Sequence, residues 1–231
     1  MNYKKVAISQ SNYIPWRGYF NLIDMADLFI FHDDIQYTKN DWRNRNKIKT
    51  AHSTKWLTIP CGVNTNRLIC EVELLDHSWQ IKHWRRISEN YHKAFYFHKY
   101  ESFFEDFYLN HLWKRLSDMN QYLIKYIARE FLDITTQFED SRKYNLRHRK
   151  GDRVLELLKK TGATEYISGP AAKNYLNPEE LEKNNIKLTW MDYSGYREYN
   201  QLFSPPFINE VSIVDLIFNT GPNARNFLQG I

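Results

Sequence analysis

Two adjacent carboxylates, Asp33 and Asp34, lie just after a short apolar run and are the first candidates for a general base. A positioned base that takes a proton from an attacking amine or hydroxyl typically contributes ~10²–10⁴ in rate. His83 is the second candidate, since an imidazole titrates near neutral pH, although its position is also typical of a surface histidine. No GxSxG motif or Cys–His pair of known spacing indicates a covalent nucleophile. The candidate catalytic residues are therefore Asp33, Asp34 and His83, for chemistry that needs no covalent enzyme intermediate.

Amide, basic and aromatic side chains that could bind a substrate accompany these carboxylates. Asparagine and glutamine amides can hold substrate oxygen atoms, and guanidinium groups can grip a phosphate through two bonds. Trp42 could stack on a base or a sugar ring, or the block around it could be a solvated turn. Gly18 could help to hold a phosphate at a helix start, or could simply be a turn glycine. The candidate substrate-binding residues are Gln10, Asn12, Tyr13, Gly18, His32, Gln36, Trp42, Arg43, Asn44, Arg45, Asn46, Lys47, Ser168 and Gly169.

A strand–loop–helix–strand unit would position the first of these residues. Residues 6–8 and 28–31 are apolar runs typical of buried strands, and residues 19–25 have the apolar spacing of a helix. Such a unit favours a parallel pair of strands, and open α/β sheets bind ligands at the carboxyl ends of their strands. Residues 9–13 and 32–36 follow the two strands, so we expect them to share one hollow at that edge.

The remaining sequence alternates between helix and strand patterns. Residues 78–131 predict two or three consecutive helices, and Ile81, Trp84 and Ile87 form the expected inner face of the first. Residues 33–49 lack an apolar period and predict a polar loop. Further strands are predicted at residues 56–60, 69–74, 134–138, 165–169 and 186–191, and further helices at 151–160, 178–184 and 212–219. The predicted fold is α/β, with a Rossmann-like, mostly parallel sheet flanked by helices. We expect a single domain over residues 1–231, with residues 78–131 as a helical insert or crossover.

Composition and charge limit the class of protein. The chain has 231 residues, of which 42% are hydrophobic and 26% charged, as in an ordinary globular protein. A net charge of +5 suits an anionic small ligand, and the scatter of basic residues among acids makes nucleic acid a less favoured partner. Cys61 and Cys70 have neither redox nor zinc spacing, and the histidines show no metal motif, so we expect free thiols and no metal. No segment predicts a signal peptide or a membrane span, so we expect a cytoplasmic protein.

Several stretches resemble the WbqC-like protein family. The resemblance runs through nearly the whole chain, and the NRN block at residues 44–46 is its most specific part. There are two departures: Ser9-Gln10-Ser11 stands where many relatives have His-Gln-Pro, and Cys61 stands where an apolar residue is common. The similar stretches are ISQSNYIPWRGYFNLI (8–23), DDIQYTKNDWRNRNKIK (33–49), WLTIP (56–60), KHW (82–84), NYHKAFYF (90–97), YISGPAAKNYL (166–176) and SIVDLIFNTG (212–221).

The resemblance implies a role in polysaccharide assembly. Many members of that family are encoded among genes for O-antigen (lipopolysaccharide) or capsule biosynthesis, and the activity implied is transfer of a glycyl or related acyl group onto an amino sugar. We therefore expect a transferase that acts on a nucleotide-linked amino sugar. Its expected co-substrate is an activated acyl donor such as a thioester of coenzyme A or of a carrier protein, without a tightly bound cofactor. The alternative is a non-catalytic module that binds a sugar nucleotide or a protein partner.

Overall fold

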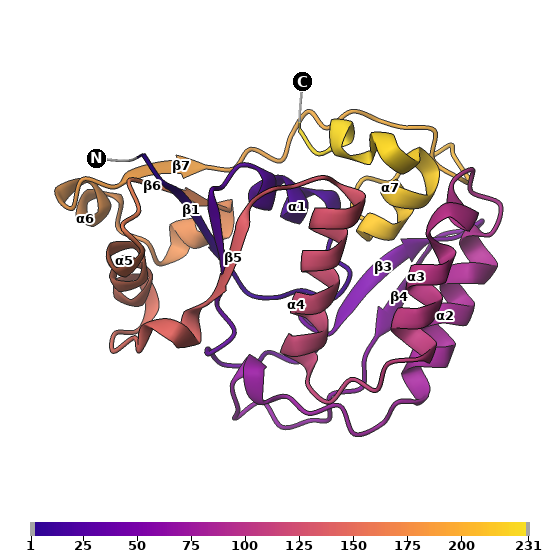
Figure 1. The fold of residues 1–231 in the computed structure, drawn as a ribbon, viewed down its shortest axis with the longest axis horizontal. Helices are drawn as coiled ribbons and strands as arrows, with labels where there is room; N and C mark the ends of the chain where they lie inside the picture. Colours follow the sequence, from indigo (N-terminus) through magenta and orange to yellow (C-terminus); the bar gives the residue numbers. More distant parts are fainter. Residues whose placement is uncertain (1–2, 230–231) are drawn as a thin grey trace.

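A five-stranded parallel sheet separates two groups of helices, in a computed structural model that describes residues 3–229 (Figure 1). The strand order is β5-β2-β1-β6-β7, and each neighbouring pair is parallel. The strands are β1 (Lys5–Ser9), β2 (Leu28–Phe31), β5 (Gln137–Asp140), β6 (Glu165–Ser168) and β7 (Lys187–Trp190). The expected α/β, Rossmann-like fold is therefore confirmed.

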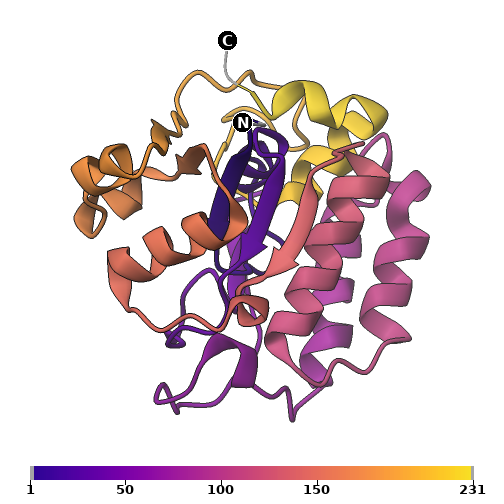
Figure 2. The same cartoon turned by 60° about the vertical axis from the view of Figure 1, so that its left-hand side comes forward.

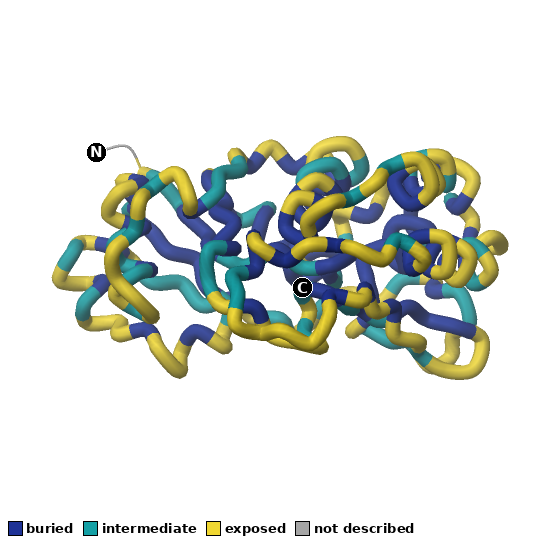
Figure 3. Tube along the Cα trace, turned by 90° about the horizontal axis from the view of Figure 1, so that it is seen from below, coloured by how far each residue is buried: buried dark blue, intermediate teal, exposed yellow. Residues whose placement is uncertain are grey.

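Alternate residues of the central strands enter two separate cores. Ala7 and Phe29 pack on one face of the sheet, whereas Val6 and Leu28 pack on the other, as the two-residue period of a strand requires. The first face carries α1 (Arg17–Asp24), α2 (Ser78–Tyr91), α3 (Phe97–Leu109), α4 (Leu116–Tyr126) and α7 (Ile213–Thr220). The second face carries α5 (Lys150–Thr161) and α6 (Pro178–Lys183), on the opposite side of the sheet in Figure 2. Buried chain runs through the interior, with exposed loops and the outer turns of helices around it (Figure 3).

An antiparallel hairpin lies outside the main sheet. Its second strand overlaps the strand predicted at residues 56–60, but its first strand lies within residues 33–49, where the sequence predicted a polar loop. Its strands are β3 (Arg45–Lys49) and β4 (Thr54–Thr58). Asn46 and Ile48 point inward and are buried, while Arg45 and Lys47 alternate with them and are only half-buried. The prediction was wrong because a polar residue occupies one of the two inward positions, which hides the alternation of apolar and polar side chains.

Two further predictions differ from the structure. Residues 69–74 form a 3-10 turn (Ile69–Glu71) instead of an edge strand, because the Glu71 carboxylate accepts the N–H of Leu68 and closes the turn. On α2, Ile81 is 65% exposed whereas His83 is 3% exposed, so the inner face of this helix is rotated from the one predicted. None of the helices within residues 3–229 has the length and apolar character that crossing a membrane requires.

The two strands that flank β1 are connected through helices on opposite faces of the sheet. The chain leaves β1 through α1 to reach β2 on one side, whereas the neighbour on the other side, β6, is reached through α5. Beyond the carboxyl ends of β1 and β6 the loops therefore separate, and such a switch point is where open α/β sheets bind ligands.

Candidate substrate-binding cleft

A cleft of about 310 Å³ opens at the carboxyl ends of β1 and β6, and we refer to it as the switch-point cleft. The loop after β1 contributes Gln10 and Asn12, and β6 with its following turn contributes Ser168 and Gly169. His32 lines it from the end of β2. The sequence predicted that side chains following β1 and β2 share a hollow at this edge, and among them Gln10, Asn12 and His32 do so. It predicted these five residues as ligand-binding candidates, and all of them line the cleft.

Aromatic side chains form much of the cleft wall. Trp16 and Tyr193 meet edge to face, with ring centroids 5.2 Å apart. Burial raises the pKa of Tyr193 to about 12, so its phenol remains a hydrogen-bond donor at neutral pH. The aromatic residues that line the cleft are Trp16, Tyr19, Trp42, Tyr166, Tyr175 and Tyr193. Of these, only Trp42 was singled out from the sequence.

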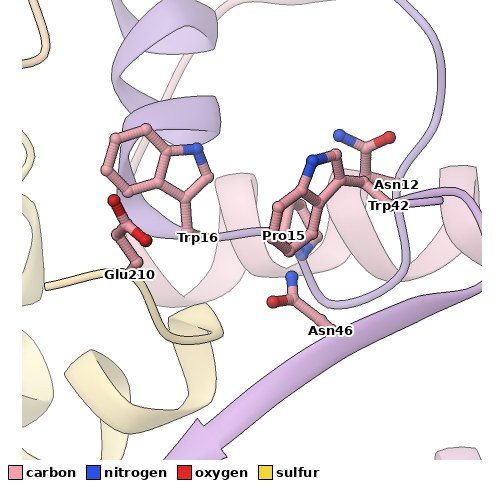
Figure 4. A pocket seen from close by; sticks show the side chains of 6 residues that line it. All are labelled: Asn12, Pro15, Trp16, Trp42, Asn46 and Glu210. Carbon is pink, nitrogen blue, oxygen red and sulfur yellow. The ribbon is translucent and has the colours of Figure 1, made fainter. Parts of the chain in front are cut away.

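A second hollow of about 270 Å³ adjoins the cleft and shares Asn12, Trp16 and Trp42 with it. Figure 4 shows the two indoles standing apart over this adjoining hollow, with Asn46 on β3 and Glu210 below them. The carboxylate of Glu210 is exposed and lies 3.8 Å from Nζ of Lys47. Among the described residues that line the two hollows, Glu210 is the one carboxylate.

Arg43 holds the Asn12 amide in place. Its Nη1 donates a 2.5 Å hydrogen bond to Oδ1 of Asn12, and its Nη2 donates to Oδ2 of Asp41 at 3.3 Å. With its oxygen occupied, the Asn12 amide has N–H groups available to a ligand in either hollow. Arg43 therefore acts on the site through Asn12, rather than as a direct phosphate ligand of the cleft.

His32 is an uncharged side chain in the cleft wall. Burial lowers its pKa to about 4, with Asp34 opposing and Arg153 reinforcing that shift. Nε of Arg153 donates to Nε2 of His32 at 3.0 Å, so the ring proton belongs on Nδ1. The imidazole is therefore neutral at pH 7, and its accepting nitrogen is already occupied.

The two predicted base carboxylates are held in internal bonds and line neither hollow. Asp33 is fully buried and accepts from the Ser11 N–H at 2.8 Å and from Nε2 of Gln121 at 2.9 Å. Burial raises its pKa above the ordinary range of a carboxyl. Asp34 pairs with Arg153 and accepts from the Ser141 hydroxyl. The expectation that these side chains face the hollow is corrected, because donors on distant elements occupy both carboxylates.

His83 does not reach the switch-point cleft. It is buried beneath the loop after β1, where Nδ1 lies 2.8 Å from the hydroxyl of Tyr13. The Tyr13 hydroxyl also lies 2.6 Å from that of Tyr108, and Tyr13 itself is fully buried. Burial lowers the pKa of His83 to about 3. The structure therefore gives Tyr13 and His83 a role in supporting the cleft loop, in place of the contacts with substrate that the sequence suggested.

Five other candidates are engaged in contacts within the protein or lie outside the switch-point cleft. Gly18 faces the ring of Trp16, where a Cβ would lie 2.3 Å from a ring atom, so it offers no open phosphate cradle. Asn44 donates to the carbonyl of Ile59, and Gln36 is exposed and lines neither hollow. Arg45 and Lys47 lie on the hairpin, where both approach the ring of Trp56.

Neither cysteine has the features of a nucleophile. Cys61 and Cys70 are free and buried, as expected for isolated thiols. Burial raises the pKa of the Cys61 thiol to about 11 and also raises that of Cys70, so both remain protonated at neutral pH. Within residues 3–229, no cluster of three histidine, cysteine or acidic side chains could hold a metal ion.

Comparison with known proteins agrees with the resemblance seen in the sequence. The model of the WbqC-like protein family matches residues 10–227. The chain is 42% identical over 228 residues to the uncharacterized protein Rv1507c of Mycobacterium tuberculosis, and the match covers 98% of both chains. No solved structure matches the chain. Since the family model spans almost its entire length, the chain belongs to the WbqC-like protein family.

Proposed function

We propose that this protein transfers a glycyl or other aminoacyl group onto the amine of a nucleotide-linked amino sugar, in O-antigen or capsule assembly. The observation that carries the proposal is the pair of connected hollows at the switch point, which share Asn12, Trp16 and Trp42. One hollow would hold the acceptor and the other the reacting end of the acyl donor. The shared residues then lie where the two substrates meet.

The lining of the switch-point cleft suits a sugar nucleotide. Indole and phenol rings can stack on a base or on the apolar face of a sugar, and amide side chains can bond the sugar hydroxyls. Gln10, Asn12 and Ser168 supply polar groups without a net charge. His32 adds a further uncharged side chain, because burial lowers its pKa to about 4.

The reaction that we propose is aminolysis of a thioester. The sugar amine attacks the acyl carbonyl, a C–N bond forms, the C–S bond breaks, and the donor leaves as a thiol. Glu210 would take the proton that the amine loses, and the leaving sulfur would be protonated from solvent. The Asn12 N–H groups would hydrogen-bond the oxyanion that develops on the carbonyl oxygen. No covalent enzyme intermediate is required, in keeping with the two protonated, buried thiols.

The test is mass spectrometry of the purified protein with a panel of nucleotide-linked amino sugars and aminoacyl thioesters. The expected product is the sugar nucleotide with its amine acylated, and an equal quantity of free thiol, which a thiol reagent can count. The Trp16→Ala variant, which removes one wall of both hollows, is the matched control and should form little product. Free thiol without acylated sugar, or no product from any pair of substrates, would contradict the proposal.

A non-catalytic binding module is the second candidate, and one observation favours it. Asp33 and Asp34, the carboxylates expected to act as bases, are engaged in internal bonds. A module of this kind would bind a sugar nucleotide in the cleft without turnover. Calorimetry separates the two functions, because the transferase binds both an acceptor and a donor, whereas the module binds the sugar nucleotide alone.

A further inference from the structure

A third hollow, of about 370 Å³, lies between β4 and α2, and we refer to it as the α2 pocket. It is separate from the switch-point cleft and contains residues that the proposed reaction does not use. Strand β4 contributes Trp56 and Thr58, and the first three turns of α2 contribute the opposite wall. Its lining residues are Trp56, Thr58, Pro60, Asp76, Ser78, Trp79, Lys82, His83 and Arg86.

Positive charge surrounds this pocket. Lys82 and Arg86 are exposed, line the pocket and stand one helical turn apart on α2. Arg45 pairs with Thr58 across the hairpin, which puts both side chains on the same face, and its guanidinium lies 4.3 Å from the ring of Trp56. Asp76 is the one acid in the lining, and its carboxylate accepts the N–H of Ser78 at 2.8 Å. The pocket therefore favours an anionic ligand.

One unsatisfied donor in a residue of the wall provides independent support for a ligand. The indole N–H of Trp79 is buried and has no hydrogen-bond partner among residues 3–229, although Trp79 lines the pocket and is only 3% exposed. Buried polar groups are rarely left unpaired, so each such donor in a native structure calls for an explanation.

Tryptophan side chains connect the α2 pocket to the proposed reaction site. Trp56 lines the α2 pocket and packs against Trp42, with ring centroids 5.5 Å apart. Trp42 in turn lines both the adjoining hollow and the switch-point cleft. An extended ligand with phosphates in the α2 pocket could therefore run along these indoles and present its other end beside Asn12.

We propose that the α2 pocket binds the phosphate groups of a nucleotide-bearing acyl donor of the coenzyme A class. This inference rests on the proposed function, since it assigns a head-group site to the donor of that reaction. Lys82 and Arg86 bind the phosphates, and the uncharged pantetheine arm follows Trp56 and Trp42 to the adjoining hollow. The switch-point cleft stays free for the acceptor.

The test is isothermal titration of coenzyme A into the full chain, with pantetheine as the probe that lacks phosphates. Wild-type protein should bind coenzyme A, with an affinity that falls as salt is added, and should bind pantetheine much more weakly. The double variant Lys82→Gln/Arg86→Gln should lose roughly tenfold or more in coenzyme A affinity, because charge-assisted bonds are lost. Arg85→Gln is the matched control, because Arg85 lies on the same helix but pairs with Glu89 and does not line the pocket. The coenzyme A affinity of this variant should stay within about twofold of wild type.

Titration of a nucleotide-linked amino sugar in the same experiments separates this inference from the proposed function. The double variant should bind the sugar nucleotide as wild type does, since the switch-point cleft is intact. If the sugar nucleotide binds but coenzyme A does not, or coenzyme A binds equally to wild type and the double variant, the α2 pocket assignment is wrong while the transferase remains possible. Binding of an acyl carrier protein in the absence of coenzyme A binding would also overturn it.

Discussion

Nη1 of Arg43 lies 2.5 Å from Oδ1 of Asn12, and this bond joins the loop after β1 to the segment that leads into the hairpin. The two residues are separated by 31 positions in the chain. Because Arg43 occupies the oxygen of the amide, it decides which atoms of Asn12 a ligand meets in the two hollows that share this side chain.

Arg43→Gln should therefore weaken acceptor binding without unfolding the protein. Loss of one charge-assisted hydrogen bond lets the Asn12 amide rotate, and we expect about 1–3 kcal/mol of lost binding free energy for a nucleotide-linked amino sugar. Calorimetry measures that change, and thermal melting should show a small shift. The exposed Lys39→Gln variant removes a positive charge nearby in sequence and should bind as wild type does. Equal affinities of the two variants would contradict the positioning role.

Gly18→Ala tests the packing of the cleft wall. An added Cβ would lie 2.3 Å from a ring atom of Trp16, so the indole must move. Helix α1 itself should tolerate alanine, which is favoured over glycine in helices by about 1 kcal/mol. We expect sugar-nucleotide binding to weaken by roughly 1–3 kcal/mol, the usual contribution of one stacking contact, with little loss of stability. Trp16→Ala should give a similar loss, and an unchanged affinity in Gly18→Ala would show that the indole does not contact the ligand.

His32 should make the protein less stable in acid. Its folded pKa of about 4 lies below its unfolded value of about 6.5, so the unfolded chain binds a proton first as the pH falls. Stability is therefore lost between pH 6.5 and 4, by about 1.4 kcal/mol per pH unit, and no further below the folded pKa. Urea unfolding at a series of pH values should show a shallower dependence for His32→Gln than for wild type. Parallel curves would mean that the histidine is equally charged in both states.

Glu210→Gln should separate catalysis from binding. The carboxylate lines the adjoining hollow and is exposed, so its replacement leaves the core unchanged. A general base typically contributes ~10²–10⁴ in rate, and we expect kcat to fall by about that order while KM for the amino sugar changes little. Glu182→Gln, on the exposed surface of α6, is the control and should retain full activity. A variant of Glu210 with normal kcat would exclude this side chain as the base.

The sequence predicted the edge of the sheet better than the roles of the residues on it. Strands β1 and β2 are apolar runs, so the positions of Gln10 and His32 after them followed from local pattern. The structural role of the Asp33 carboxylate could not be predicted, because Gln121, which donates a hydrogen bond to it, lies 88 residues away on α4. A strand was predicted at the position of β4, but β3 was missed because inward-pointing Asn46 donates its amide to loop carbonyls, a contact that no periodicity reveals.

Asp33→Asn distinguishes a structural from a catalytic carboxylate. Both carboxylate oxygens of Asp33 accept from fixed donors, the Ser11 N–H and the Gln121 amide, and an asparagine would bring an NH₂ group against one of them. We expect the free energy of unfolding to fall by about 1–3 kcal/mol, because a buried donor loses its partner. Below its melting temperature, the variant should bind the sugar nucleotide and turn over at rates within a few-fold of wild type, since Asp33 lines neither hollow. A loss of turnover of ~10² or more in a variant with normal stability would instead restore Asp33 as the base.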